Sequence, residues 1–131
     1  MNRIAIVEDD QGYRDTLFIY IKQYEQERDT AFEATPFEKA DDFLAVYNGD
    51  YDIILMDIMM PKMDGHQAAK EIRAMYADRP DAEEIPIIAL SANAFSEDVQ
   101  ASLDAGMNGH VSKPLNMEEV TKVIERNLNR P

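Results

Sequence analysis

The sequence predicts an α/β domain in which a parallel five-stranded sheet carries helices on both faces. Short apolar runs and amphipathic stretches alternate five times along the chain, which is the pattern of repeated β/α units. The apolar runs are largely uninterrupted by polar residues, as expected for strands buried on both faces. A length of 131 residues fits one domain, and no repeat or linker divides it, so we expect a single domain over residues 1–131.

The first half of the chain predicts two strands, each followed by a helix. Residues 3–7 (RIAIV) form an apolar run, and residues 32–37 form a weaker one. Helices are expected over residues 11–27 and from Ala40 to Tyr47, where Asn48-Gly49 would end the second helix. The tyrosines of the first helix are expected to pack with their hydroxyls in water. The two helical stripes are Tyr13, Leu17, Tyr20, Ile21 and Tyr24, and Ala40, Phe43, Leu44 and Tyr47.

The second half of the chain continues the alternation. A third helix follows the Asp64-Gly65 turn, and its His66 is expected to face solvent. Gly106 is expected to stop the short helix before the last strand. The expected strands are residues 51–57, 85–91 and 110–112; the expected helices are one marked by Ala68, Ala69, Ile72, Met75 and Tyr76, one over residues 96–104 and one marked by Met117, Val120, Ile124 and Leu128.

Composition excludes several classes of function. Thirteen basic and 26 acidic residues give a net charge of −13, so the domain repels phosphate backbones and direct nucleic-acid binding is not expected. No apolar stretch approaches the roughly 20 residues that span a bilayer, so no membrane insertion is expected. The N-terminus lacks a signal-peptide pattern, and the chain has no cysteine, which together predict a cytoplasmic protein.

A single carboxylate interrupts the third apolar run. In DIILMDIMMPKMDG, residues 52–65, Asp57 lies among isoleucines and methionines. Burial of an ionised carboxylate is costly unless it is paired or bound to metal. Ligands of open α/β sheets bind at the carboxyl ends of the strands, so the polar residues that end the strands are expected to meet there. They are Glu8, Asp9 and Asp10 after the first strand, Asp57 after the third, Ser91 after the fourth, and Lys113 with Pro114 after the fifth.

These groups suit phosphoryl transfer with a hard cation. Carboxylates without cysteine or a histidine cluster favour an oxygen-binding ion, Mg²⁺ first and Mn²⁺ as the alternative. A lysine and a hydroxyl on the opposite side would bind the other phosphoryl oxygens. Asp57 is then left as a nucleophile towards phosphorus, which gives an aspartyl phosphate. The metal and Lys113 would offset the cost of its burial.

Four segments together resemble the response-regulator receiver domains. They are VEDD at 7–10, LMDIMMPKMDG at 55–65, ALSA at 89–92 and SKP at 112–114, in the family's order and on the expected elements. The resemblance covers the whole chain and implies a doubly wound, flavodoxin-like sheet of order 2-1-3-4-5. It implies a signalling switch that accepts a phosphoryl group from a sensor histidine kinase or a histidine phosphotransfer protein. It also implies no enzymatic activity beyond self-phosphorylation and self-dephosphorylation.

Position by position, the resemblance makes Asp57 the phosphoacceptor. Asp9 would bind Mg²⁺ directly and Glu8 mostly through water, and the main-chain carbonyl of Met59 would be the third protein ligand. Asp10 is expected to be only the N-cap of the following helix.

The resemblance also predicts how the phosphate is sensed. Ser91 would be the switch hydroxyl, beside the small Ala92, and Lys113 would pair with the acceptor or its phosphate. The Lys113–Pro114 peptide bond would be cis. The output surface would comprise the helix over 96–104, the strand over 110–112 and the last helix, including Phe95, His110 and Met117. A homodimer through the same surface is a further expectation.

Two positions depart from the family pattern, and two other functions compete. Receivers often carry Tyr or Phe three residues before the lysine, where this chain has His110, whose imidazole can titrate near neutral pH. Met59 stands where a polar residue could orient a hydrolytic water. The main alternative function is a Mg²⁺-dependent phosphohydrolase that also forms an aspartyl phosphate, but such enzymes usually place a second acid at the position of Met59. Nucleotide or flavin binding is weaker still, because no glycine-rich phosphate loop is present.

Overall fold

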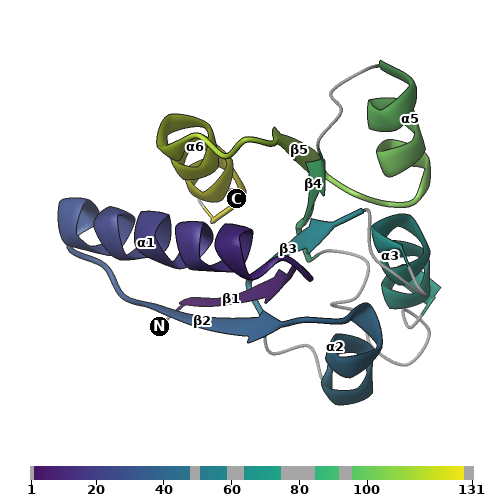
Figure 1. The fold of residues 1–131 in the computed structure, drawn as a ribbon, viewed down its shortest axis with the longest axis horizontal. Helices are drawn as coiled ribbons and strands as arrows, with labels where there is room; N and C mark the ends of the chain where they lie inside the picture. Colours follow the sequence, from purple (N-terminus) through teal and green to yellow (C-terminus); the bar gives the residue numbers. More distant parts are fainter. Residues whose placement is uncertain (1, 48–50, 59–63, 75–84, 92–95, 129–131) are drawn as a thin grey trace.

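The computed structural model describes residues 2–47, 51–58, 64–74, 85–91 and 96–128, and these form one parallel sheet flanked by helices (Figure 1). The sheet has the order β2-β1-β3-β4-β5 that the resemblance implied. The edge strand β2 contains Pro36, which is tolerated there because an edge strand need not use every N–H in the ladder. The strands are β1 (Asn2–Val7), β2 (Phe32–Phe37), β3 (Ile53–Asp57), β4 (Ile87–Ser91) and β5 (Gly109–Ser112).

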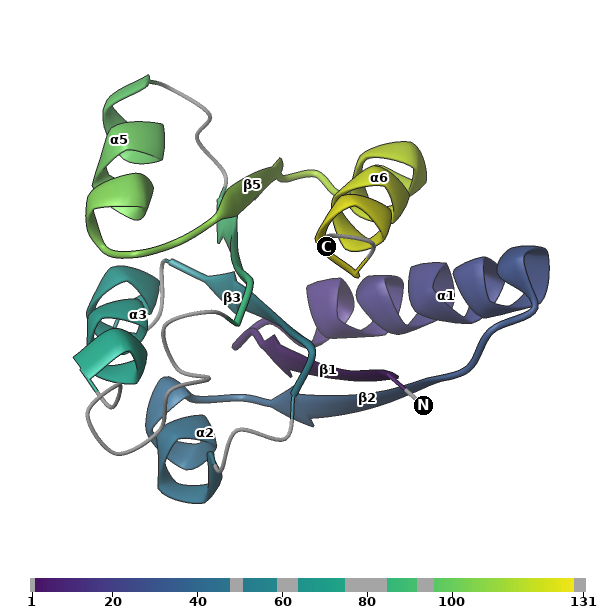
Figure 2. The same cartoon turned by 180° about the vertical axis from the view of Figure 1, so that it is seen from behind.

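The helices cover both faces of the sheet. Figures 1 and 2 show α1 and α6 on one face and α2, α3 and α5 on the other. Their bounds are α1 (Gln11–Arg28), α2 (Ala40–Val46), α3 (Gly65–Ala74), α5 (Ser96–Asp104) and α6 (Met117–Leu128). Within the described ranges, none of these helices combines the length and hydropathy that crossing a bilayer requires.

Alternation along the strands divides the apolar side chains into two cores. In β1, Ile4 and Ile6 belong to the core under α1 and α6, whereas Ala5 and Val7 belong to the core under α2 and α3. All four side chains are fully buried. Because both faces are covered, the strands read as continuous apolar runs, as the sequence predicted.

Several boundaries differ from the sequence-based expectation by one or two residues. β3 begins at Ile53 instead of residue 51. Just before it, the Asp52 side chain accepts a hydrogen bond from the Arg3 amide at 2.7 Å. β4 begins at Ile87 instead of residue 85, since Pro86 has no N–H for a ladder. α2 ends at Val46, and Tyr47 follows in extended backbone while remaining buried. Met75, Tyr76 and Phe95 lie outside the described residues, as does the expected Asn48-Gly49 stop.

The expectation that His66 faces solvent is wrong. Its side chain is half-buried, and Nε2 lies 2.9 Å from the Oγ of Ser102, a buried residue of α5. The sequence pattern of α3 alone could not show this contact, because it depends on α5 packing beside α3.

Candidate functional site

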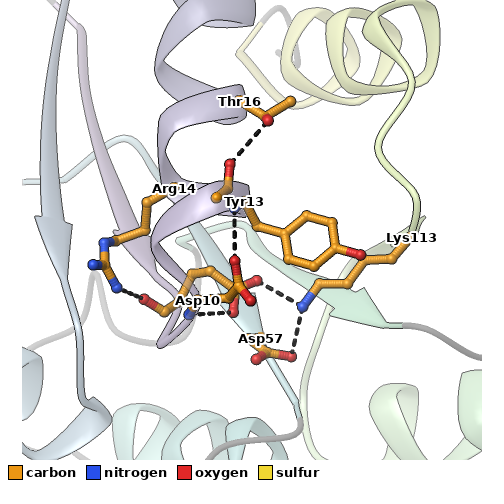
Figure 3. Close-up of polar contacts among 8 residues, drawn as sticks. Asp10, Tyr13, Arg14, Thr16, Asp57 and Lys113 are labelled. Carbon is orange, nitrogen blue, oxygen red and sulfur yellow. Dashed lines mark hydrogen bonds and ion pairs between the residues drawn. The ribbon is translucent and has the colours of Figure 1, made fainter.

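The polar residues that end the strands meet at one edge of the sheet, as expected. Glu8 follows β1 and Asp57 ends β3, the neighbouring strand, and their side chains are 0% and 2% exposed. Lys113 follows β5, whose connection to α6 brings the lysine back over the edge (Figure 3). The Lys113–Pro114 peptide bond is cis, in agreement with the expectation.

Lys113 binds both buried carboxylates. Its Nζ lies 2.7 Å from Glu8 Oε1 and 3.4 Å from Asp57 Oδ1 (Figure 3 draws the contact with Asp57), and its side chain is only 10% exposed. Burial alone would lower the pKa of Lys113. The hydrogen bond to Glu8 and the charges of Asp57 and Glu8 outweigh that effect, so its pKa is raised. The lysine is therefore held as an ammonium ion.

One ammonium does not compensate the acids around it. Burial, followed by a hydrogen bond with the Asp57 side chain, raises the pKa of Glu8 to about 8, and Lys113 only partly opposes this. Glu8 therefore keeps its proton at neutral pH when no other cation is near. The site contains more potential negative charge than Lys113 can balance.

The acids fit a divalent cation. Glu8, Asp9 and Asp57 each offer a carboxylate oxygen, and these oxygens all lie within 4.8 Å of one another. An all-oxygen donor set suits Mg²⁺, which binds one or two carboxylates and keeps several waters. A bound cation would favour the ionised form of Glu8 and so oppose the effect of burial on its pKa. Met59, predicted to add a carbonyl ligand, lies outside the described residues, as does Ala92.

The first turn of α1 is built directly onto Glu8. Asp10 is the N-cap, as expected, and its side chain accepts a hydrogen bond from the Tyr13 amide at 3.1 Å (Figure 3). The Asp10 amide donates to Glu8 Oε2 at 3.2 Å, and the Arg14 guanidinium donates to the Glu8 carbonyl at 2.7 Å. Hydrogen bonds thus connect the start of α1 to Glu8 of the acid cluster.

Ser91 and Lys113 are joined through the backbone. Ser91 is 2% exposed at the end of β4, next to Ser112 of β5, and its carbonyl accepts a hydrogen bond from the Lys113 amide at 2.8 Å. His110 lies two positions before Ser112 on β5 and is half-buried. Its Nε2 is enclosed and has no hydrogen-bond partner among the residues that the structure describes.

Gly65 allows α3 to start against the strand that carries Asp57. Its amide donates to the Ile58 carbonyl at 3.2 Å, and a Cβ at this position would lie 2.8 Å from Ile58 Cα and would overlap the Asp57 carbonyl. Only glycine allows the chain to pass this close to the strand that carries Asp57.

Two residues of the site were not singled out by the sequence pattern. Tyr13 was expected to be a packing residue, yet the Lys113 Nζ lies 4.3 Å from the centre of its ring. Arg14 anchors the main chain of Glu8. Their positions in the sequence could have indicated these roles. Tyr13 and Arg14 lie three and four residues after the N-cap Asp10, and the first turn of the helix must lie near the end of β1.

Comparison with known proteins identifies relatives along nearly the whole chain. Residues 4–125 match the response regulator receiver domain. The transcriptional regulatory protein RprY of Bacteroides fragilis is 37% identical over 98% of this chain, which covers 50% of RprY. The sensor protein GacS of Pseudomonas syringae pv. syringae is 38% identical over 61% of this chain, corresponding to 9% of GacS. The chain thus spans half or less of the length of these relatives.

Solved structures show the same fold. The receiver domain of the sensor histidine kinase PA1611 from Pseudomonas aeruginosa PAO1 has a TM-score of 0.82 and 28% identity, with 98% of each chain covered, and holds a magnesium ion coordinated in its active site cleft. The chemotaxis response regulator CheY4 of Vibrio cholerae has a TM-score of 0.82 at 23% identity, with 98% of this chain and 99% of that chain covered. The chain therefore belongs to the response regulator receiver domain family, the phosphorylation-dependent switches of two-component signalling.

Proposed function

We propose that Asp57 is the phosphoacceptor of this receiver and takes its phosphoryl group from the phosphohistidine of a sensor histidine kinase or a histidine phosphotransfer protein. The observation that carries the proposal is the surroundings of Asp57: a buried carboxylate 3.4 Å from an ammonium and within a cluster of acids that fits a divalent cation. A buried carboxylate is costly unless it is paired or bound to a metal, and here Lys113 and a divalent cation at the acid cluster would meet that cost.

In the transfer, an Asp57 carboxylate oxygen forms a bond to phosphorus as the phosphorus–nitrogen bond of the donor breaks. The electron pair of that bond stays on the imidazole nitrogen, which takes up a proton. Lys113, held as an ammonium, stabilises the charge on the phosphoryl oxygens as a point charge. In self-dephosphorylation, water attacks phosphorus and Asp57 leaves as a carboxylate, with inorganic phosphate and a proton as products. The domain catalyses these two steps on itself alone.

Glu8, Asp9, Asp57 and the carbonyl of Met59 would hold the metal, Mg²⁺ or alternatively Mn²⁺. When bound, the ion neutralises charge that develops on the transferring phosphoryl group. The support for this set is the cluster of acid oxygens and the magnesium in the PA1611 receiver domain.

The output surface that we propose comprises α5, β5 and α6. Ser91 and Lys113 both act from this side of the phosphate, and the hydrogen bond between their backbones ties β4 to the end of β5. A shift of either side chain towards a phosphoryl oxygen would therefore be transmitted to His110 and to Met117 at the start of α6. The same surface is the proposed site of homodimer formation.

Residues 1–131 are proposed to act as one receiver domain in the cytoplasm, where ATP is available to histidine kinases. A strongly acidic surface, with a net charge of −13, speaks against direct contact with nucleic acid and leaves proteins as its partners. The histidine kinase relatives support a phosphohistidine donor over a phosphohydrolase function.

The test is covalent labelling with acetyl phosphate and Mg²⁺, followed by intact-protein mass spectrometry and borohydride trapping of the acyl phosphate. We expect one phosphoryl group per chain, on Asp57, and none after chelation of the metal. Asp57→Asn should not be labelled, because an amide is a poor nucleophile. Asp52→Asn, just before the opposite end of the same strand, is the matched control and should be labelled normally. Undiminished labelling of Asp57→Asn would refute the assignment.

A further inference from the structure

The ammonium of Lys113 has an aromatic neighbour besides the carboxyl groups of Glu8 and Asp57. The ring of Tyr13 lies with its centre 4.3 Å from Nζ, within the range of a cation–π contact (Figure 3). Since the lysine side chain is only 10% exposed, water competes weakly with this contact.

The ring is held in place by the helix that carries it. The Tyr13 amide donates to the Asp10 side chain, and Asp10 and Arg14 bind Glu8, so the backbone at Tyr13 is fixed relative to the acid cluster. Thr16 adds a hydrogen bond from its hydroxyl to the Gly12 carbonyl at 2.9 Å within the same turn (Figure 3). The ring therefore has a defined position over the side chain of Lys113, a residue from the C-terminal part of the sequence.

Lys113 needs such a restraint. A lysine side chain is long and rotatable, and its ammonium is a compact charge without the planar fork that orients an arginine. Its contacts with Glu8 and Asp57 are unequal, 2.7 Å and 3.4 Å, so the longer contact with Asp57 restrains the ammonium only weakly.

We propose that Tyr13 is a positioning residue of the phosphorylation site: its ring, placed by the first turn of α1, holds the Lys113 ammonium over Glu8 and Asp57. This inference rests on the function proposed above and adds a residue to it. The ring makes the contact and the hydroxyl is not required, so phenylalanine should replace Tyr13 and leucine should not.

The experiment compares Tyr13→Leu with Tyr13→Phe, and uses Tyr51→Leu as a matched control. Tyr51 also stacks on a cation, the Arg3 guanidinium at 4.7 Å, but lies just before the start of β3, away from Asp57. Two quantities are measured: the rate of phosphorylation of Asp57 by acetyl phosphate, and the NMR resonances of the Lys113 side chain in the metal-free, unphosphorylated protein. The second quantity does not depend on any reaction.

Tyr13→Leu should slow phosphorylation roughly three- to tenfold, the fold-change that corresponds to loss of a partly buried cation–π contact. It should also remove the ring-current shift of Lys113. Tyr13→Phe should restore both, and Tyr51→Leu should change neither. In a Lys113→Met background, Tyr13→Leu should cause no further slowing, because its effect passes through the lysine.

Equal slowing by Tyr13→Leu in the presence and absence of Lys113 would overturn the proposal, as would wild-type rates in Tyr13→Leu. If the wild-type protein were not labelled at all, the proposed function would fail. The Lys113 resonances would still decide the positioning role: a shift lost in Tyr13→Leu supports it, and an unchanged shift overturns it.

Discussion

Replacement of Glu8 by glutamine should make the metal-free protein more stable, and the gain should grow with pH. The Glu8 side chain is fully buried beside Asp57, and its pKa is raised from 4.5 to about 8, chiefly by burial. Since the pKa in the folded chain lies above that of the unfolded chain, folding requires Glu8 to keep a proton that the unfolded chain releases. The stability that depends on this proton is fully present below pH 4.5 and is lost as the pH rises towards 8.

The magnitude follows from the two pKa values. Each unit between them corresponds to about 1.4 kcal/mol, so by pH 7 the wild-type protein has lost about 3 kcal/mol relative to pH 4.5 through this group. Glutamine has no proton to lose and resembles the protonated acid in shape. The difference in unfolding free energy between Glu8→Gln and the wild type should therefore rise by about 3 kcal/mol from pH 4.5 to pH 7.

The assay is urea unfolding in EDTA at several pH values, with Glu33→Gln as the matched control. Glu33 is an exposed acid on β2, and its replacement should shift stability by no more than about 0.5 kcal/mol at any pH. With Mg²⁺ at a hundredfold excess over its Kd, the wild type should gain about 2.7 kcal/mol and Glu8→Gln less. A stability difference between Glu8→Gln and wild type that stays flat between pH 4.5 and 8 would refute the reasoning.

Three further predictions concern Met59, the start of α3 and the output surface. Met59→Asn should shorten the lifetime of the phosphorylated protein in Mg²⁺, because an amide can orient the attacking water whereas a thioether is a weak acceptor; equal decay of both proteins would contradict this. Gly65→Ala should cost about 1–3 kcal/mol in urea unfolding, because a Cβ would lie 2.8 Å from the Ile58 Cα; wild-type stability would mean that the backbone can shift there. Phosphorylation should change amide exchange across α5, β5 and α6; changes confined to α1 and α2 would place the output surface elsewhere.

Most of the fold could be predicted because the strands are buried on both faces. The five apolar runs and the helical stripes located every described element to within about two residues, and the order of polar residues at the strand ends indicated which side chains would meet. Errors at the strand starts came from local hydrogen bonding and from Pro86, which apolar patterning does not register.

Contacts between elements were harder to predict. The bond from His66 to Ser102 and the ring of Tyr13 on Lys113 each join residues of different elements. A single-element pattern shows only that a residue is polar or aromatic. The contacts of His66 and Tyr13 depend on where α5 and the end of β5 lie. Those positions follow from the packing of the complete domain and not from the pattern of a single element.

The 2.7 Å contact between Lys113 Nζ and Glu8 joins the residue that follows the first strand to the residue that follows the last strand. During synthesis, Glu8 and Asp57 therefore leave the ribosome before Lys113 does. A nascent chain that lacks β5 has the nucleophile but neither the ammonium nor the Ser91–Lys113 backbone bond. The ability to accept a phosphoryl group should thus arise only after β5 has joined the sheet. Phosphorylation of a chain would therefore indicate that its sheet is fully formed.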